Sequence, residues 1–168
     1  RILAIELRAS RMGYALFEGP RRLLDWGTTA IRPEGNAKTA TTHKPISELL
    51  KALSPSAVVV KKIRRWRHDK RARTQAVLRQ IQLEAAAHSI AVIYIGQKDI
   101  DNIFRMYRVH TKYEIAYVLV LAFPELLPKL PPKRKIGTSE PQAMIVFDAV
   151  ATGFAYLQPT AIEAPPPE

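Results

Sequence analysis

The chain has 168 residues, no cysteine and a formal net charge of +11 at pH 7. This length suits one domain that folds without disulfides or metal ions, and the lack of cysteine excludes thiolate metal sites. The charge favours a polyanionic partner. We expect a cytoplasmic protein that does not enter a membrane, because the longest apolar run, 115–123, is far shorter than a bilayer span.

The first part of the chain predicts three antiparallel strands. The apolar residues 2–5 predict a buried strand, and residues 13–17 predict a second strand after a turn. Turn residues at 18–20 separate it from residues 22–31, whose β-branched and aromatic side chains favour a third strand. We expect these strands to form a meander.

The middle of the chain predicts a unit of two parallel strands. A helix through residues 46–53 ends at Ser54-Pro55, and the run 57–60 has no polar alternation, which is typical of a strand covered on both faces. An amphipathic helix over 69–88 then leads to a strand at 91–95. A strand, a helix and a strand in this order favour a parallel pair.

The last part of the chain predicts helices and a tail. Helices are expected over 99–107 and 111–123, the second opened by a capping box of Thr111 and Glu114. Prolines make 123–136 an irregular connection, and Ser139 with Gln142 predicts the cap of a final helix through 144–157. With no linker visible, we expect one domain over 1–158 and a disordered tail over 159–168.

Two basic clusters predict a nucleic-acid interface. Guanidinium groups can clamp phosphate oxygens, and an exposed tryptophan can stack on an unpaired base. A solvated helix face, with Trp66 packing its loop onto the body, is the alternative interpretation. The predicted nucleic-acid-binding residues are Lys62, Arg64, Arg65, Trp66, Arg67, Lys70, Arg71, Arg73, Lys133, Arg134 and Lys135.

The order of these elements and five short motifs resemble a known family. The motifs are ILAIE at 2–6, RMGYA at 11–15, LSPSAVVV at 53–60, AAA with IAV at 85–92, and FDAVA at 147–151. They resemble the RuvC-type Holliday-junction resolvase branch of the ribonuclease H-like superfamily. The resemblance implies an α/β, ribonuclease H-like fold with a central mixed five-stranded sheet, three antiparallel strands then two parallel, flanked by helices. It also implies branched DNA as a ligand and leaves room for a homodimer through the last helices.

In that family, the resemblance implies, carboxylates from the first strand, the central strand and the last helix hold two Mg²⁺ or Mn²⁺ ions that activate water for phosphodiester cleavage. Glu6 and Asp148 match two of these positions and are the candidate catalytic and metal-binding residues. Lys61 and Ile145 fall on positions where the family has acids.

The expected neighbours of these acids follow from charge and helix geometry. We expect Lys61 to pair with Glu6 or Asp148, in a buried Glu6–Lys61–Asp148 network that neutralises the site. Glu140, eight residues before Asp148, would lie about 12 Å away if both shared a helix. For Glu140 we therefore predict a role at the helix N-terminus, where its charge meets the helix dipole.

Three functions stay open on the sequence. The favoured one is a nucleic-acid-binding protein for branched or structured DNA, with impaired or lost metal-dependent endonuclease activity. The alternative enzyme is an active, structure-selective endonuclease that resolves crossover junctions in DNA recombination and uses Mg²⁺ or Mn²⁺. The third is a protein-interaction scaffold whose basic strip meets an acidic protein partner.

Overall fold

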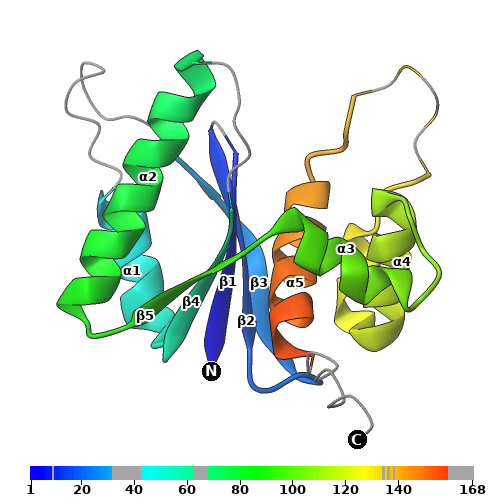
Figure 1. Ribbon diagram of the computed structural model, residues 1–168, viewed down its shortest axis with the longest axis horizontal. Helices are drawn as coiled ribbons and strands as arrows, with labels where there is room; N and C mark the ends of the chain where they lie inside the picture. The colour runs from blue at the N-terminus through cyan, green and yellow to red at the C-terminus, as the bar shows by residue number, and fades with distance from the viewer. Residues whose placement is uncertain are drawn as a thin grey trace, which may run out of the picture.

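A single mixed sheet organises the computed structural model of the chain (Figure 1). The structure describes residues 1–8, 10–31, 43–62, 68–133, 135, 137 and 139–158, with the side chains of 43–45 and 68–73 left out. The strand order is β3-β2-β1-β4-β5. The strands are β1 (Ile2–Leu7), β2 (Arg11–Phe17), β3 (Leu23–Ala30), β4 (Ala57–Lys61) and β5 (Ala91–Ile95).

The pairing of the strands confirms the predicted sheet. The pairs β1–β2 and β2–β3 are antiparallel, whereas β1–β4 and β4–β5 are parallel. The two central strands lack polar alternation because both of their faces are covered. Val58 and Val60 pack in one core cluster, while Val59 packs in the other cluster on the opposite face.

Helices cover the two faces of the sheet unequally. On one face, α1 (His43–Leu53) and α2 (His68–Ala87) contribute Ile46, Leu50, Val77 and Ile81 to the core. On the other face, α5 (Met144–Leu157) lies against the sheet, with α3 (Gln97–Arg105) and α4 (Lys112–Ala122) packed on its far side (Figure 1). No helix in the described part of the chain has the length and apolar character needed to cross a membrane.

Two glycines allow α5 to approach the sheet closely. A Cβ atom built at Gly13 of β2 would lie 2.5 Å from the carbonyl oxygen of Ile145, and one built at Gly153 of α5 would overlap Phe17. Ile145 and Phe17 are both almost completely buried. The glycines therefore set how near α5, with Asp148 on it, lies to the strands.

The start of α4 confirms the predicted capping box. The Thr111 Oγ1 atom accepts a hydrogen bond of 3.2 Å from the Glu114 N–H, and the Thr111 N–H donates to Glu114 Oε2 at 2.9 Å. Two orphan donors of the first turn are thereby satisfied. The cap fixes the residue after it, Lys112, as the first residue of the helix.

The cap of α5 differs from the prediction, although the helix itself, Met144–Leu157, spans the predicted residues. Ala143 precedes the helix and no side chain caps it, so Ser139 and Gln142 do not form the predicted cap. Instead, the N–H of Met144 bonds to the carbonyl of Pro141 at 3.1 Å in a tight turn. Glu140 therefore lies before the helix, and the prediction of a helix N-terminal role for it is wrong.

The proline-rich connection is more regular than expected. Residues 123–136 were predicted to be irregular, but a 3₁₀ helix, η1 (Pro124–Lys129), forms within them. Pro124 is accommodated at its first position, where the missing N–H has no intrahelical partner to lose. Burial of Leu126 ties the turn to the core. The predicted tail, 159–168, lies outside the described residues, and the domain boundary at 158 stays a prediction.

Candidate functional site

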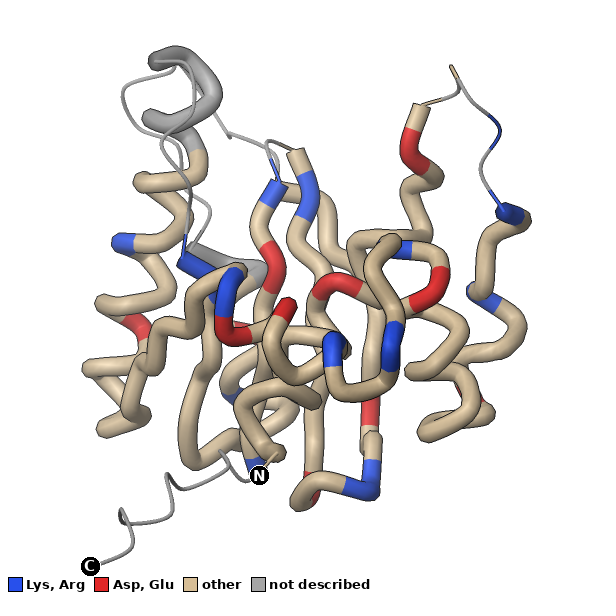
Figure 2. Tube along the Cα trace, turned by 45° about the vertical axis from the view of Figure 1, so that its right-hand side comes forward, with Lys and Arg blue, Asp and Glu red and all other residues tan. Residues whose placement is uncertain are grey.

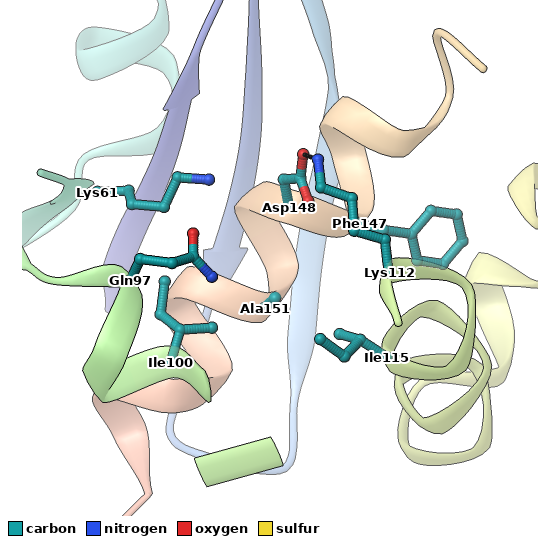
Figure 3. A pocket seen from close by; sticks show the side chains of 8 residues that line it. All are labelled: Lys61, Gln97, Ile100, Lys112, Ile115, Phe147, Asp148 and Ala151. Atoms are coloured by element: carbon teal, nitrogen blue, oxygen red, sulfur yellow. Dashed lines mark hydrogen bonds and ion pairs between the residues drawn. The ribbon is translucent and has the colours of Figure 1, made fainter. Parts of the chain in front are cut away.

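The carboxyl ends of β1 and β4 carry the candidate site. The two strands are parallel neighbours in which Ile5 pairs with Val60, so the next residues, Glu6 and Lys61, emerge side by side. Asp148 comes to the same end from α5, which packs on this part of the sheet. In Figure 3 the Lys61 side chain reaches from the end of β4 toward α5.

Glu6 and Lys61 form a nearly buried ion pair. The Lys61 Nζ atom lies 2.8 Å from Glu6 Oε1, which is one of the two pairings predicted for Lys61. Only 8% of Glu6 is exposed, and its second oxygen, Oε2, is buried without a hydrogen-bond partner among the described residues. Burial raises the pKa of Glu6 above 4.5 against the opposing effect of Lys61, and the charge of Asp148 raises it further. Lys61 therefore satisfies only one of the two carboxylate oxygens of Glu6.

Asp148 belongs to a separate cluster of four charged side chains, which we call the ion-pair cluster: Arg8, Lys112, Glu140 and Asp148. Asp148 Oδ2 lies 2.7 Å from Arg8 Nη2 and 3.0 Å from Lys112 Nζ. Glu140 contacts the same two cations, with Oε2 3.1 Å from Arg8 and Oε1 2.7 Å from Lys112. Two anions and two cations thus alternate around one point.

The ion-pair cluster corrects two predictions. Asp148 does not join Glu6 and Lys61 in one network, because its ion pairs go to Arg8 and Lys112. Glu140 is not too remote to act with Asp148, because the chain before α5 is not helical and brings the two carboxylates to shared partners.

The pKa of Lys112 reflects this surrounding charge. Desolvation alone would lower the pKa, but the charge of Asp148 and the hydrogen bonds to Glu140 and Asp148 outweigh it, and the pKa lies above 10.5. Lys112 therefore stays a cation throughout the physiological range.

A small pocket separates the Glu6–Lys61 pair from α4. It is polar on one part of its wall and apolar on the rest (Figure 3). The lining residues are Lys61, Gln97, Lys112 and Asp148, together with Ile100, Ile115, Phe147 and Ala151. Ile145, which the resemblance was expected to align with an acid, is 1% exposed and packs in the core.

The residues present do not fit a pair of divalent ions. Glu6, Asp148 and Glu140 are each already within 3.1 Å of a side-chain cation. Within the described residues, no three His, Asp or Glu side chains form a group that could hold a metal ion. Three carboxylates and three cations sum to zero charge, whereas Mg²⁺ and Mn²⁺ sites depend on uncompensated oxygen ligands. A divalent ion here would meet three neighbouring cations.

The predicted nucleic-acid-binding residues are partly placed by the structure. Lys62, directly after β4, and Lys133 and Lys135, between η1 and α5, are exposed. The first turn of α2 and the connection from η1 to α5 flank the carboxyl ends of β1 and β4 (Figure 1). Lys70, Arg71 and Arg73 lie on α2 with side chains left undescribed, and Arg64, Arg65, Trp66, Arg67 and Arg134 lie outside the described residues.

Sequence reasoning missed Arg8, Lys112 and Gln97. The sequence places Arg8 at the end of the first strand, two residues after Glu6, and Lys112 at the start of a helix, directly after its cap. Neither position signals a contact with Asp148, which lies 140 and 36 residues away along the chain. Figure 2 shows where the basic and acidic positions lie along the Cα trace.

Three solved structures are similar to this chain. The structure of Thermus thermophilus RuvC in complex with a Holliday junction substrate aligns with a TM-score of 0.68 and 17% identity, over 92% of this chain and 90% of RuvC. A second structure of Thermus thermophilus RuvC aligns with a TM-score of 0.66 and 18% identity, over 92% of this chain and 91% of RuvC. The yeast mitochondrial Holliday junction resolvase Ydc2 aligns with a TM-score of 0.47 and 14% identity, over 94% of this chain and 80% of Ydc2.

No protein-family model matches the sequence, and no curated protein is similar to it. The structural likeness to RuvC nevertheless confirms the predicted fold. The chain has a RuvC-like, ribonuclease H-like fold.

Proposed function

We propose that this chain binds branched or structured DNA through basic residues around the end of the sheet, and that it does not cleave DNA by the two-metal reaction. The observation that carries the proposal is the pairing of all three carboxylates at the site with cations of the chain itself. The RuvC-like fold, seen in RuvC with a Holliday junction substrate, supports a DNA ligand.

The distribution of charge supports nucleic acid as the partner. The net charge is +11, yet the carboxylate site is neutral, so the excess lies elsewhere. Lys62, Lys133 and Lys135 provide exposed cations on both sides of the site. Because the carboxylates of the site are paired with cations, a polyanion that binds the surrounding lysines meets no unpaired carboxylate there.

The neutralised site argues against metal-dependent cleavage. Such cleavage requires carboxylate oxygens that are free to hold the ions that activate water. Here Lys61 lies 2.8 Å from Glu6 Oε1 and Arg8 lies 2.7 Å from Asp148 Oδ2, so each acid has a cation beside one of its two oxygens. At an effective dielectric constant near 20, one cation and a divalent ion at such distances repel by several kcal/mol.

A single titration tests both parts of the proposal. Labelled duplex, fork and four-way junction DNA are titrated with the protein over a range of salt, in EDTA and in Mn²⁺, and each tube is scored for binding and for cuts. We expect junction binding in EDTA, a log–log salt slope of several units, and no cutting in Mn²⁺.

Two results would contradict the proposal. Cutting in Mn²⁺ that disappears in the Asp148→Asn variant would show an active endonuclease. Binding that is weak and independent of salt would remove the nucleic-acid part and favour a protein-interaction scaffold. The matched variants are Lys62→Gln, which should weaken binding, and Lys51→Gln, an equal charge change on α1, which should not.

A further inference from the structure

Lys61 touches both Glu6 and the pocket. Its Nζ atom lies 2.8 Å from Glu6 Oε1, and the residue also lines the pocket with Gln97, Lys112 and Asp148. In Figure 3 its ammonium points into the space between β4 and α5. An ammonium has three N–H donors, and Glu6 is the one ion-pair partner of Lys61 within the described residues. Donors therefore remain for a ligand in the pocket.

The polar wall of the pocket offers N–H donors to an anion. Two ammonium groups, Lys61 and Lys112, line it with one carboxylate, Asp148, and both ammonium groups also pair with carboxylates, so the N–H donors rather than a net positive charge hold the anion. The Gln97 side chain adds amide donors beside Lys61. The rest of the lining is apolar, and a charge-assisted hydrogen bond to phosphate is stronger in such surroundings than in water.

We propose that this pocket binds a backbone phosphate of the nucleic acid directly through the Lys61 ammonium, with Gln97 and Lys112 beside it. The inference rests on the proposed function. Lys61 neutralises Glu6 and faces the phosphate, as a divalent ion does at a carboxylate site of a metal-dependent nuclease. An ammonium supplies the positive charge but activates no water, so the phosphate is held and not cleaved.

The test measures the salt dependence of junction binding. Fluorescence anisotropy of a labelled four-way junction in EDTA is compared for the wild type and Lys61→Gln across a range of salt. Loss of one charged contact should weaken binding about tenfold and make the log–log slope shallower by about one. Lys51→Gln, with the same charge change on the helix layer across the sheet, should stay within about twofold of the wild type.

A Glu6→Gln variant separates phosphate contact from a purely structural role. It breaks the same ion pair but frees the ammonium, so it should bind the junction at least as tightly as the wild type. The double variant Lys61→Gln with Glu6→Gln has neither the ammonium nor an unpaired buried carboxylate. A structural role alone predicts that this double variant binds like the wild type, which would overturn the inference, whereas a phosphate contact predicts that it binds as weakly as Lys61→Gln. Circular dichroism at the assay temperature checks that all three variants are folded.

The remaining outcomes distinguish this inference from the proposed function. Normal binding by the wild type with an unchanged slope in Lys61→Gln would overturn only the phosphate site. Absence of salt-dependent binding by the wild type to every probe would overturn both.

Discussion

The Glu6–Lys61 pair and the ion-pair cluster lie at the same end of the sheet but give their carboxylates different surroundings. Glu6 has a single cation, Lys61, and one buried oxygen without a partner. Asp148 shares two cations with a second carboxylate, in a cluster that reaches solvent through Lys112, whose side chain is 52% exposed. The number of cationic partners and the access to water, rather than the charge of the acid, decide how well the polar atoms of each carboxylate are satisfied.

The comparison also assigns different structural roles to the two groups. The Glu6–Lys61 pair links adjacent strands that backbone hydrogen bonds already join. The ion-pair cluster links the end of β1, the start of α4, the segment before α5, and α5 itself. We therefore expect Glu6 to make the stability depend on pH, and the ion-pair cluster to hold the surrounding segments together.

The largest effect is expected from Lys61→Met. Removing the cation leaves Glu6 as a buried, unpaired carboxylate, which should lower the free energy of unfolding at pH 8 by about 3–5 kcal/mol. Urea unfolding measures the change. The double variant Lys61→Met with Glu6→Gln should recover most of the loss, and a single-variant loss below about 1 kcal/mol would show that Glu6 does not depend on the pair.

Asp148→Asn should cost less, about 1.5–3 kcal/mol, because Glu140 still accepts from both cations of the ion-pair cluster. The same urea experiment measures the change. Asp101→Asn, which alters an exposed hydrogen bond from Gln97 on α3, is the control and should change stability by less than about 0.5 kcal/mol. A cost for Asp148→Asn larger than that of Lys61→Met would reverse the comparison.

The free energy of unfolding should depend on pH through Glu6. Because its folded-state pKa is raised above 4.5, the folded state binds more protons than the unfolded state as pH falls through the folded pKa. The contribution of Glu6 is fully present below pH 4.5 and is lost as pH rises through the folded value. Stability of the wild type relative to Glu6→Gln should therefore rise between pH 8 and pH 4.5, as measured by urea unfolding; a difference that is constant with pH would contradict the raised pKa.

The smallest effect is expected from Arg22→Gln. Arg22 lies 2.6 Å from Glu18 in the turn after β2, but its side chain is 70% exposed. Pairs in water contribute little, so the loss should stay under about 0.5 kcal/mol in thermal or urea unfolding. If Arg22→Gln lowers the free energy of unfolding as much as Asp148→Asn does, burial does not explain the order of the predicted stability losses.

Local patterns were sufficient for the element order. The apolar run at Val58–Val60 predicted a central strand, and the Thr111–Glu114 pattern predicted a helix start that the structure confirms. The pattern of Ser139 and Gln142 is of the same kind, yet these residues form no cap, because a tight turn from Pro141 leads into the helix at Met144. Capping residues predict a start only where the backbone before the helix is free to present them.

For the site, the sequence by itself identified Glu6 and Asp148 as the candidate acids and Lys61 as a cation at the end of the central strand. It left open which of the two acids Lys61 would pair with, and the register of the adjacent parallel strands decided for Glu6. Only the tertiary structure decided the partners of Asp148. Arg8 and Lys112 reach it from 140 and 36 residues away, because α5 packs on the sheet and α4 packs on α5. Ion pairs depend on distances of a few ångströms between side chains, and packing sets those distances, whereas hydrophobic periodicity acts along a single element and is visible in the chain alone.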